Sequence, residues 1–566
     1  MKILGLTVTT HDTSAALFVN SELKIAIEEE RLIREKHTFK FPQNAIETCL
    51  NHESINIDEL DCISICWNLN KILIERYMKK IFDSDFNGLV QDRRSEIERL
   101  IEIEDKLKNM GYNGIIEFND HYDCHTIYSF YSSNFNNCAF LTLDGFGEIE
   151  SGRIGCVKDG NMEIWKSYSI ENSLGLFYSA FTDFLGFKSN YDEGIVMGLS
   201  AYGDSTQTIP GKGITYEDLF KDMIILENDK QFYHINREYF LYGLRRVGWV
   251  SEKLREYLGE PRGKNEKIND HYKNIANALQ KRIEETLAHL SNKLYSKYGL
   301  KNMCISGGLG LNCVANGKLL FNTKFEDIHI PCAPADNGLS IGAGLVSLKK
   351  RGSIKKISPS AYLGPIYENR VIEKSMLELL DIKISRENIG NDYSKIANLI
   401  QDGKIVAIFH GRSEFGPRAL GNRSIIAKPF PVEMKDYVNK QVKFREEFRP
   451  FAPAILEEYS DQYFEIKGES NNMIKTFQVK PEKIKAIEAV VHVDGTGRVQ
   501  TVSEKLYNNF YLIIKSFYDL TGVPVIMNTS FNVKGQPIVE TPEEAIKTFL
   551  STKIDALLLG KYLIIK

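Results

Sequence analysis

The sequence contains no long apolar segment. Nowhere in its 566 residues does an uninterrupted apolar run reach about 18 residues, the length that a transmembrane helix needs. The start, MKILGLTV, has the pattern of a strand and is too short and too soon polar for a secretory signal. These absences predict a cytoplasmic protein without a membrane partner.

Paired cysteine motifs are also missing. The nine cysteines all lie between Cys49 and Cys332, and none forms a CxxC pattern. Most stand in apolar runs, as Cys138 and Cys304 do. This distribution predicts reduced, mostly buried thiols, which are typical of the cytoplasm, and it argues against a zinc site built from cysteine pairs.

The chain has no excess of positive charge. Its 71 Lys and Arg residues against 75 Asp and Glu residues give a formal net charge of -4. General nucleic-acid binding usually needs a basic excess, so this charge argues against a nucleic-acid partner. With 43% hydrophobic residues, a chain of 566 residues can bury the cores of two or more domains.

Strand-like runs and turns follow the same order in two places. The first copy covers residues 3–8, 14–19 and 24–28, and the second covers residues 138–143, 152–157 and 162–165. This repetition predicts two related α/β halves. A strand, a hairpin and then helices is the pattern of the actin-like (ASKHA) nucleotide-binding fold, so we predict a duplicated α/β domain of this type over residues 1–350.

Helices are predicted between and after these strands. Residues 205–300 should be largely helix and loop, and apolar side chains at helical spacing predict the clearest helix over residues 274–298. A buried strand over residues 302–306 runs into Gly307 and Gly308. A strand, a glycine turn and a helix in this order present backbone N–H groups to a phosphate. Another helix is predicted over residues 339–349.

A change in composition marks a domain boundary. Residues 349–356 are strongly basic, and Ser-Pro-Ser-Ala follows at residues 358–361. From there to the end the chain has neither cysteine nor tryptophan. Strands are predicted over residues 405–409, 490–493 and 523–527. We therefore predict a second α/β domain over residues 358–566.

The second domain holds two cationic clusters. Residues 411–424 contain three arginines, three glycines and one proline, and residues 443–451 add one lysine and two arginines. Glycines let a backbone approach a ligand closely, and arginines offer planar forks to phosphate and carboxylate oxygens. The clusters indicate a pocket for a polyanionic small molecule. The alternative is a turn whose arginines pair with nearby acids.

Two histidines and two aspartates form a candidate metal site. His121 and His125 are four residues apart and share one face if the segment is helical, which is a common half of a metal site. Asp144 and Asp336 each end a strand-like run beside glycine. Such a set suits Fe(II), Mn(II) or Zn(II) rather than a structural zinc. The alternative is two surface histidines and two turn-capping aspartates.

His11 and Asp12 occupy the first predicted hairpin. His11 could act as a general base, because the ordinary pKa of histidine lies near neutrality. The alternative is an Asp/Ser turn with a solvent-facing histidine, and spacing does not decide between them. In the second domain, residues 492–500 and 528–532 have the small and polar side chains of pocket edges.

Four motifs, taken together, connect the chain to a family. They are GGLGLN at residues 307–312, GPRALGNRS at 416–424, RPFAP at 449–453 and NTSFN at 528–532. With the His11–Asp12 hairpin, they make the chain resemble the O-carbamoyltransferases of nodulation and antibiotic biosynthesis, the NodU/CmcH group, over nearly its whole length. The resemblance implies an actin-like domain similar to the TsaD-type tRNA threonylcarbamoyl transferases, followed by a YrdC-like α/β domain.

The resemblance also implies a reaction in two steps. Carbamoyl phosphate and ATP, the latter with Mg²⁺, would yield carbamoyl-AMP in the YrdC-like domain, releasing pyrophosphate and phosphate. The carbamoyl group would then pass to a hydroxyl of a small-molecule acceptor, of the natural-product kind, in the actin-like domain. A divalent metal, Fe(II) with Mn or Zn as alternatives, and a homodimer are implied as well.

Site residues follow from the resemblance, position by position. The implied catalytic residues are His11, Asp12, Arg418, Lys443 and Arg449. The implied substrate- and nucleotide-binding residues are Gly145, Gly308, Asn312, Arg423, Arg498, Asn528 and Ser530. The implied metal ligands are His121, His125, Asp144 and Asp336.

Two positions depart from the family pattern, and three other functions compete with carbamoyl transfer. Ile195 stands where the family often has a lysine, and Asp120 stands where it has a histidine beside the metal ligands. The competing functions are tRNA threonylcarbamoylation, a small-molecule kinase on the actin-like fold, and a non-catalytic carbamoyl-nucleotide sensor. The acidic net charge argues against the first, and a kinase leaves the arginine-rich second domain unexplained.

Overall fold

The chain forms two compact units. The computed structural model describes residues 1–8, 10–68, 70–71, 94–229, 231–241, 249–379, 384–443 and 448–566. The first unit contains Met1–Leu23, Phe39–Pro42 and Ser54–Ser358, and the second contains Lys24–Thr38, Gln43–Glu53 and Pro359–Lys566. Residues 444–447 of the second predicted cationic cluster lie outside the described residues.

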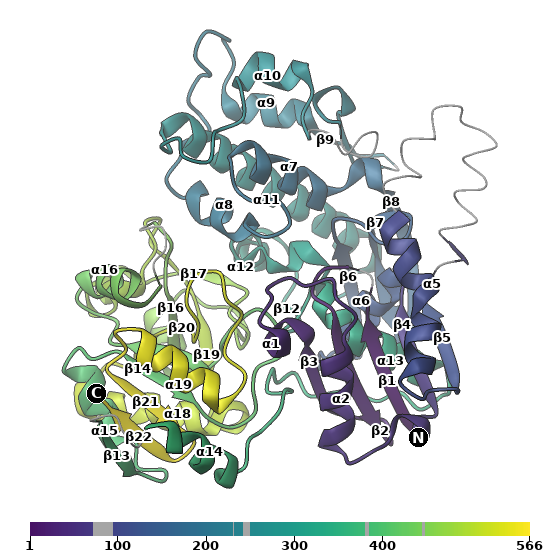
Figure 1. Ribbon diagram of the computed structural model, residues 1–566. Helices are drawn as coiled ribbons and strands as arrows, with labels where there is room; N and C mark the ends of the chain where they lie inside the picture. Colours follow the sequence, from purple (N-terminus) through teal and green to yellow (C-terminus); the bar gives the residue numbers. More distant parts are fainter. Residues whose placement is uncertain are drawn as a thin grey trace. The chain divides into compact units, whose positions relative to one another are not determined.

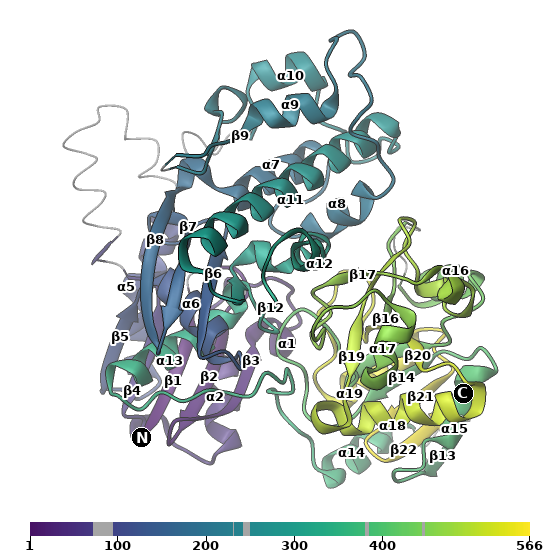
Figure 2. The same ribbon diagram turned by 180° about the vertical axis from the view of Figure 1, so that it is seen from behind.

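Two five-stranded sheets of the same topology form the centre of the first unit, except that residues 24–28 of the strand β3 are grouped with the second unit (Figures 1 and 2). One has the order β3-β2-β1-β4-β5, with β1 (Lys2–Thr7), β2 (Ser14–Val19), β3 (Glu22–Glu28), β4 (Cys62–Cys66) and β5 (Ile115–Asn119). The other has the order β8-β7-β6-β11-β12, with β6 (Asn137–Leu143), β7 (Glu150–Lys158), β8 (Asn161–Ser169), β11 (Asn302–Ser306) and β12 (Asp327–His329). In each, the first strand pairs antiparallel with the second and parallel with a later one. This match confirms the predicted duplicated, actin-like α/β arrangement.

Two helices pack on these sheets and on each other. The helix α13 (Leu339–Lys350) contacts β1 and β4, while α6 (His121–Tyr131) contacts β11 and also α13. The helices can approach closely because α13 carries glycines at the contact: a Cβ added at Gly342 would lie 2.3 Å from the Cys124 carbonyl oxygen. The packing therefore fixes α6, and with it His121 and His125, against the second sheet.

Helices make up most of the remainder of the first unit. They are α5 (Arg94–Asn109), α7 (Leu174–Phe184), α8 (Glu193–Ser200), α9 (Tyr216–Met223), α10 (Glu252–Leu258), α11 (Asp270–Tyr298) and α12 (Cys313–Asn322). The predicted helix at 274–298 is confirmed as α11, which ends at Gly299 in the left-handed conformation (φ 63°). The segment 205–300 also contains a hairpin, β9 (Ile224–Leu226) with β10 (Tyr233–Ile235), which the prediction of helix and loop missed. Strands of three residues are too short to show an alternating pattern.

An eight-stranded mixed sheet forms the centre of the second unit. Its order is β13-β22-β21-β14-β15-β20-β16-β19. The strands are β13 (Ser385–Asn388), β14 (Val406–Phe409), β15 (Arg423–Ala427), β16 (Ala452–Leu456), β19 (Gln500–Val502), β20 (Val525–Ser530), β21 (Ala556–Leu559) and β22 (Tyr562–Ile565). A separate ribbon pairs β17 (Thr476–Gln478) with β18 (Thr496–Arg498). The strands predicted at 405–409 and 523–527 are confirmed as β14 and β20.

The helices of the second unit include two from the N-terminal part of the chain. They are α1 (Glu29–Ile33), α2 (Gln43–His52), α14 (Asn369–Ser375), α15 (Ser394–Gln401), α16 (Glu433–Val438), α17 (Ser460–Tyr463), α18 (Glu504–Thr521) and α19 (Pro542–Ser551). A hydrophobic core joins α15 and α18 to the sheet through residues such as Ile400, Ile426 and Phe517. Burial of this apolar surface drives the packing of the helices on the strands.

The strand predicted at 490–493 is wrong. Residues Glu488–Val490 form a 3₁₀-helix, and the backbone beyond it makes a turn. The N–H of Ala489 donates to the Pro429 carbonyl at 2.9 Å, and that of His492 donates to Thr496 at 2.7 Å. Val490 is buried but Val493 is 60% exposed, and the backbone groups of the run are satisfied by turns instead of a strand partner.

The structure also bears on the nine cysteines and on membrane-spanning segments. All nine cysteines are buried, and none of them forms a disulfide, as predicted. Among the described residues, no helix combines the length and the apolar character that a membrane crossing requires.

Candidate functional site

The helix α6 holds both predicted metal-binding histidines on one face. Asp120 is its N-cap residue and accepts a hydrogen bond from the N–H of Asp123. Four residues make slightly more than one turn, so His121 and His125 point the same way. Both imidazoles are buried, at 0% and 1% exposure. The alternative of two surface histidines is therefore wrong.

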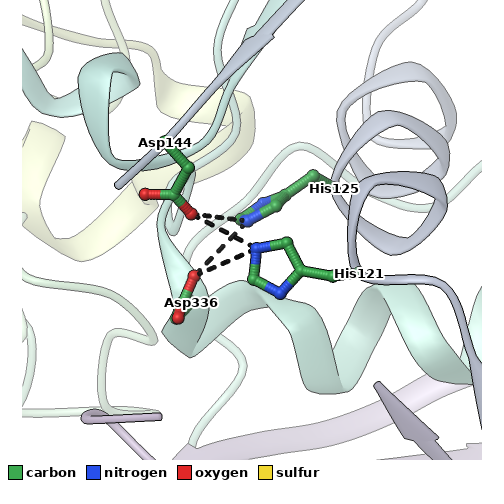
Figure 3. Close-up of side chains that lie close together, drawn as sticks. All are labelled: His121, His125, Asp144 and Asp336. Carbon is green, nitrogen blue, oxygen red and sulfur yellow. Dashed lines mark hydrogen bonds and ion pairs between the residues drawn. The ribbon is translucent and has the colours of Figure 1, made fainter. Parts of the chain in front are cut away.

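Asp144 and Asp336 face these histidines (Figure 3). Asp144 directly follows β6, and its Oδ1 accepts the N–H groups of Gly145 at 2.8 Å and Gly308 at 3.0 Å. These bonds turn its Oδ2 toward the Nε2 atoms of His121 and His125, at 3.4 and 3.2 Å. Asp336 begins the 3₁₀-helix η5 (Asp336–Gly338), and its Oδ1 lies 3.7 and 3.4 Å from the same two nitrogens.

The four groups fit a divalent metal. One ligand atom from each lies within 4.8 Å of the others. Around a tetrahedral metal with bonds of about 2.1 Å, ligand atoms are about 3.4 Å apart, close to the distances found here. Oδ1 of Asp336 is buried and has no hydrogen-bond donor among the described residues. A buried carboxylate oxygen of this kind needs a cation or a donor beside it.

Electrostatics supports the same conclusion. Burial lowers the pKa of His125, but its contacts with Asp144 and Asp336 raise it more, to about 9. Burial raises the pKa of Asp144, but the imidazoles of His121 and His125 hold it well below its usual range. Two carboxylates therefore create a strongly negative site, where a bound cation replaces protons.

Charged residues anchor the N-terminal end of α6. The Asp120 carboxylate pairs with Arg153 Nη2 at 2.8 Å and with Lys71 Nζ at 2.6 Å, which lowers its pKa to about 2 against the effect of burial. Glu148 is fully buried, and its Oε1 accepts the N–H of His121 at 3.0 Å. Asp120 thus replaces the family histidine with an anchor for the helix. Ile195, the other departure, is buried in α8.

His11 and Asp12 contact each other. His11 Nδ1 lies 2.7 Å from Asp12 Oδ2, and Asp12 adopts the left-handed conformation (φ 66°). Burial lowers the pKa of His11, but the carboxylates of Asp12, Asp336 and Asp144 raise it more, to about 9. The histidine therefore belongs to the electrostatic surroundings of the candidate metal site.

The predicted phosphate-binding turn follows β11. Gly307 has a φ of 84°, and a Cβ there would lie 2.1 Å from the Leu143 carbonyl oxygen, so only glycine fits. Asn312 is the N-cap of α12, where its Oδ1 accepts the N–H of Ala315 at 3.1 Å. Its amide also exchanges hydrogen bonds of 3.0 Å with Gln280. Asn312 therefore shapes the turn, and its nucleotide contact stays a prediction.

In the second unit, strand register gathers the predicted anion-binding residues. The strands β15 and β16 run antiparallel to β20, and β19 runs parallel to β16. The beginnings of β15, β16 and β19 therefore lie at the end of β20. Three predicted arginines precede these strands and two predicted polar residues end β20: Arg418, Arg449, Arg498, Asn528 and Ser530.

Lys443 joins this group through its ammonium. It is the last residue of a π-helix, Asn439–Lys443, and is 5% exposed. Its Nζ donates to the Ser530 carbonyl at 2.8 Å, and it contacts Asn532 Oδ1 at 2.7 Å and the Asn532 carbonyl at 3.1 Å. Four oxygens within 3.2 Å hold the positive charge in one place.

The arginine loop at 411–424 folds around its own acid. Glu414 is buried, and its Oε1 accepts the N–H groups of Leu420 at 2.7 Å, Asn422 at 2.8 Å and Arg423 at 3.3 Å. Gln500 Nε2 donates to the Leu420 carbonyl at 2.8 Å. Glu414 therefore satisfies three backbone N–H groups from inside the loop, and Gln500 satisfies a carbonyl from outside it.

The arginines of this loop have different surroundings. Arg423 is fully buried: its Nη1 donates to the His410 carbonyl at 2.8 Å, and its guanidinium lies 3.7 Å from the Phe409 ring centre. Arg412 donates to the carbonyls of Lys24 and Leu363, each at 2.6 Å. Arg418 is half-buried. Arg423 and Arg412 bind backbone carbonyls of the second unit and so stabilise its fold. A substrate contact of Arg423 stays a prediction.

Three supporting residues are absent from the sequence-based site. Glu414 and Asn532 lie inside the quoted motifs, but their contacts are with backbone groups and with a lysine distant in sequence. Gln500 donates to Leu420, and its Oε1 accepts from Asn528 Nδ2 at 2.9 Å. Gln500 begins the buried three-residue strand β19, and its place at the end of the predicted pocket edge 492–500 was the available signal.

Comparison with known proteins identifies the family. Residues 2–345 match the model described as "Carbamoyltransferase N-terminus", and residues 397–566 match "Carbamoyltransferase C-terminus". The chain is 33% identical to protein sll1178 of Synechocystis sp., covering 100% of this chain and 96% of that one. It is 33% identical to nodulation protein NolNO of Sinorhizobium fredii, covering 98% and 79% of the two chains. It is 35% identical to nodulation protein U of Rhizobium tropici, covering 44% and 41%.

The chain belongs to the carbamoyltransferase family. Both family models match, and together they span most of the two units. The protein is therefore a carbamoyltransferase, which confirms the resemblance inferred from the four motifs.

Cation binding should tighten as the pH rises. A metal must displace the proton of His125, whose pKa is raised to about 9, so affinity should increase about tenfold per pH unit for each proton displaced. Calorimetric titration with Mn(II) between pH 6 and 9 would measure this slope. His125→Gln should abolish tight binding, whereas His234→Gln, at a partly exposed histidine of the same unit, should not change it. Binding that is independent of pH would contradict the site.

Removal of the Glu414 carboxylate should unfold the arginine loop. Glu414→Ala leaves three backbone N–H groups without their buried acceptor, so we expect a loss of about 3 kcal/mol or more in the stability of the second unit. Glu414→Gln keeps an acceptor oxygen and should lose less. Scanning calorimetry would measure both, and equal losses in the two variants would show that the acceptor is not what matters.

Proposed function

We propose that this carbamoyltransferase makes carbamoyl-AMP from carbamoyl phosphate and ATP in its second unit. The supporting observation is the fixed position of the Lys443 ammonium, which contacts Ser530 and Asn532. These residues lie at the end of β20, next to the starts of three strands that each follow a predicted arginine. Carbamoyl phosphate and ATP carry many anionic oxygens, and charge develops on them during phosphoryl chemistry. A fixed cluster of cations suits such substrates.

The proposed first step balances with one water molecule. Water cleaves carbamoyl phosphate to carbamate and phosphate, and a carbamate oxygen then attacks the α-phosphorus of ATP. A mixed carbamoyl–phosphate anhydride bond forms, the α–β anhydride breaks, and pyrophosphate leaves with Mg²⁺. Arg418, Lys443, Arg449 and Arg498 would neutralise the reacting oxygens, and Asn528 and Ser530 would orient them.

The proposed second step takes place in the first unit. A hydroxyl of a small-molecule acceptor attacks the carbamoyl carbon, and AMP leaves. His11 would take the hydroxyl proton at Nε2, because its Nδ1 contacts Asp12. Gly145, Gly308 and the turn that Asn312 shapes would hold the nucleotide.

The second step would use a divalent cation. His121, His125, Asp144 and Asp336 would bind it, and we propose Fe(II) from the resemblance. When bound, the cation would stabilise the adenylate phosphate and so make AMP a better leaving group. The net charge of -4 favours a small acceptor over a nucleic acid.

Adenylate formation should occur without any acceptor. Purified protein with ATP, carbamoyl phosphate and Mg²⁺ should form pyrophosphate and carbamoyl-AMP, detected by mass spectrometry. Arg418→Ala should slow this about 100-fold, as loss of a charge-stabilising donor does. Arg370→Ala, at an arginine of the same unit that is 82% exposed, should leave the rate unchanged. Formation of ADP, or no pyrophosphate from the folded wild type, would overturn the proposal.

His11 should titrate far above an ordinary histidine. Its pKa is raised to about 9, so the metal-free protein should show a histidine NMR signal with that midpoint, absent in His11→Gln. Asp12→Asn removes a carboxylate that raises the pKa, so the midpoint should move to lower pH. A bound cation should also lower it, which would make His11 a better base near neutrality. A midpoint near 6.5 in the wild type would contradict the assignment.

A further inference from the structure

Gly416, in the centre of the arginine loop, is held by two residues from the N-terminal part of the chain. Its N–H donates to Glu28 Oε1 at 2.6 Å, and its carbonyl accepts from Arg31 Nη2, also at 2.6 Å. Glu28 ends β3 and Arg31 lies in α1, and both belong to the second unit together with the loop. Both backbone groups of one glycine are therefore bound by charged side chains almost 390 positions away in sequence.

These two contacts are strong for their kind. Glu28 is 3% exposed and Arg31 is 1% exposed, so water hardly competes for them. A charged partner makes a hydrogen bond shorter and stronger than a neutral one does. Arg31 Nε also lies 3.8 Å from Glu28 Oε2, so each side chain helps to hold the other. The pair is here called the Glu28–Arg31 clamp.

The conformation of Gly416 sets the direction of the backbone that follows it. Its φ of 108° is one that glycine adopts readily and other residues do not. The next residue is Pro417, whose ring fixes its own φ near −65°. With the peptide groups of Gly416 held and Pro417 rigid, the backbone direction at Arg418 has little freedom left.

We propose that Glu28 and Arg31 are positioning residues for Arg418. They would set the backbone from which Arg418 reaches its anionic substrate, without touching that substrate themselves. This rests on the proposed function of the second unit. A guanidinium must be placed to within a fraction of an ångström to neutralise a reacting oxygen well, and clamping the preceding glycine achieves this.

Arg34 offers a matched control. It belongs to the same N-terminal segment and the same unit, and its guanidinium also donates to backbone carbonyls, those of Pro537 at 2.8 Å and Ile538 at 2.6 Å. It therefore anchors the segment as Arg31 does, but to a different loop. Arg31→Lys and Arg34→Lys both keep the charge and lose the planar fork.

The test compares these variants in the full-length protein. Arg31→Lys should raise the KM for carbamoyl phosphate in carbamoyl-AMP formation at least tenfold, with a smaller effect on kcat, and Arg34→Lys should stay within twofold of the wild type. If Arg31 acts through Arg418, the double variant Arg31→Lys/Arg418→Lys should be no worse than Arg418→Lys alone. Equal KM effects of Arg31→Lys and Arg34→Lys, or additive losses in the double variant, would overturn the proposal.

Hydrogen exchange measures the effect of the clamp on the loop independently of the enzyme reaction. Amides in residues 414–420 should exchange at least tenfold faster in Arg31→Lys than in the wild type, and Arg34→Lys should leave them protected. Unchanged protection in Arg31→Lys would overturn the clamp even if the enzyme is active. If the wild type makes no carbamoyl-AMP, the proposed function fails, and the clamp is then decided by this exchange and by calorimetric binding of carbamoyl phosphate to the same variants.

Discussion

Buried carboxylates that accept backbone N–H groups hold the functional loops of both units. Asp144 accepts the N–H groups of Gly145 and Gly308, and Glu414 accepts three from the arginine loop. Glu148 accepts the N–H that begins α6 at His121. A buried anion is costly unless several donors surround it, so each of these acids imposes one conformation on the peptide groups around it. This constraint sets the positions of the candidate site residues that these loops and α6 carry.

The duplicated architecture explains how loops from both halves of the first unit contribute to one candidate site. Its two sheets have the same strand order, in which β6 corresponds to β1 and β11 to β4, and candidate site residues follow three of these strands. His11 follows β1, Asp144 follows β6, and Gly308 follows β11. Ligands of open α/β sheets bind beyond the carboxyl ends of the strands. Repetition of one topology therefore supplies loops from both halves to a common region.

The candidate sites of the two units differ in the charge of their side chains. In the first, Asp144 and Asp336 face two imidazoles, and the net effect favours a cation. In the second, Lys443 is fixed on oxygen acceptors at strand ends that arginines precede. Opposite charge requirements are hard to satisfy in one pocket, because each group would pair with its neighbour instead of the substrate. Dividing them between two units lets one chain carry both a carboxylate-lined candidate metal site and a cluster of cationic side chains.

The sequence by itself determined the elements and the motifs. Helical spacing predicted α11, the i, i+4 pair predicted that His121 and His125 share a face, and glycine turns marked the loops, because these depend on residues close in the chain. Only the tertiary structure decided that Asp336 faces the histidines and that residues 24–38 complete the second unit. Those contacts join positions hundreds of residues apart, where local spacing carries no information. Apolar content also could not tell that residues 490–493 form a turn, because apolar residues occur both in strands and in turns, and only the hydrogen-bond partners distinguish the two.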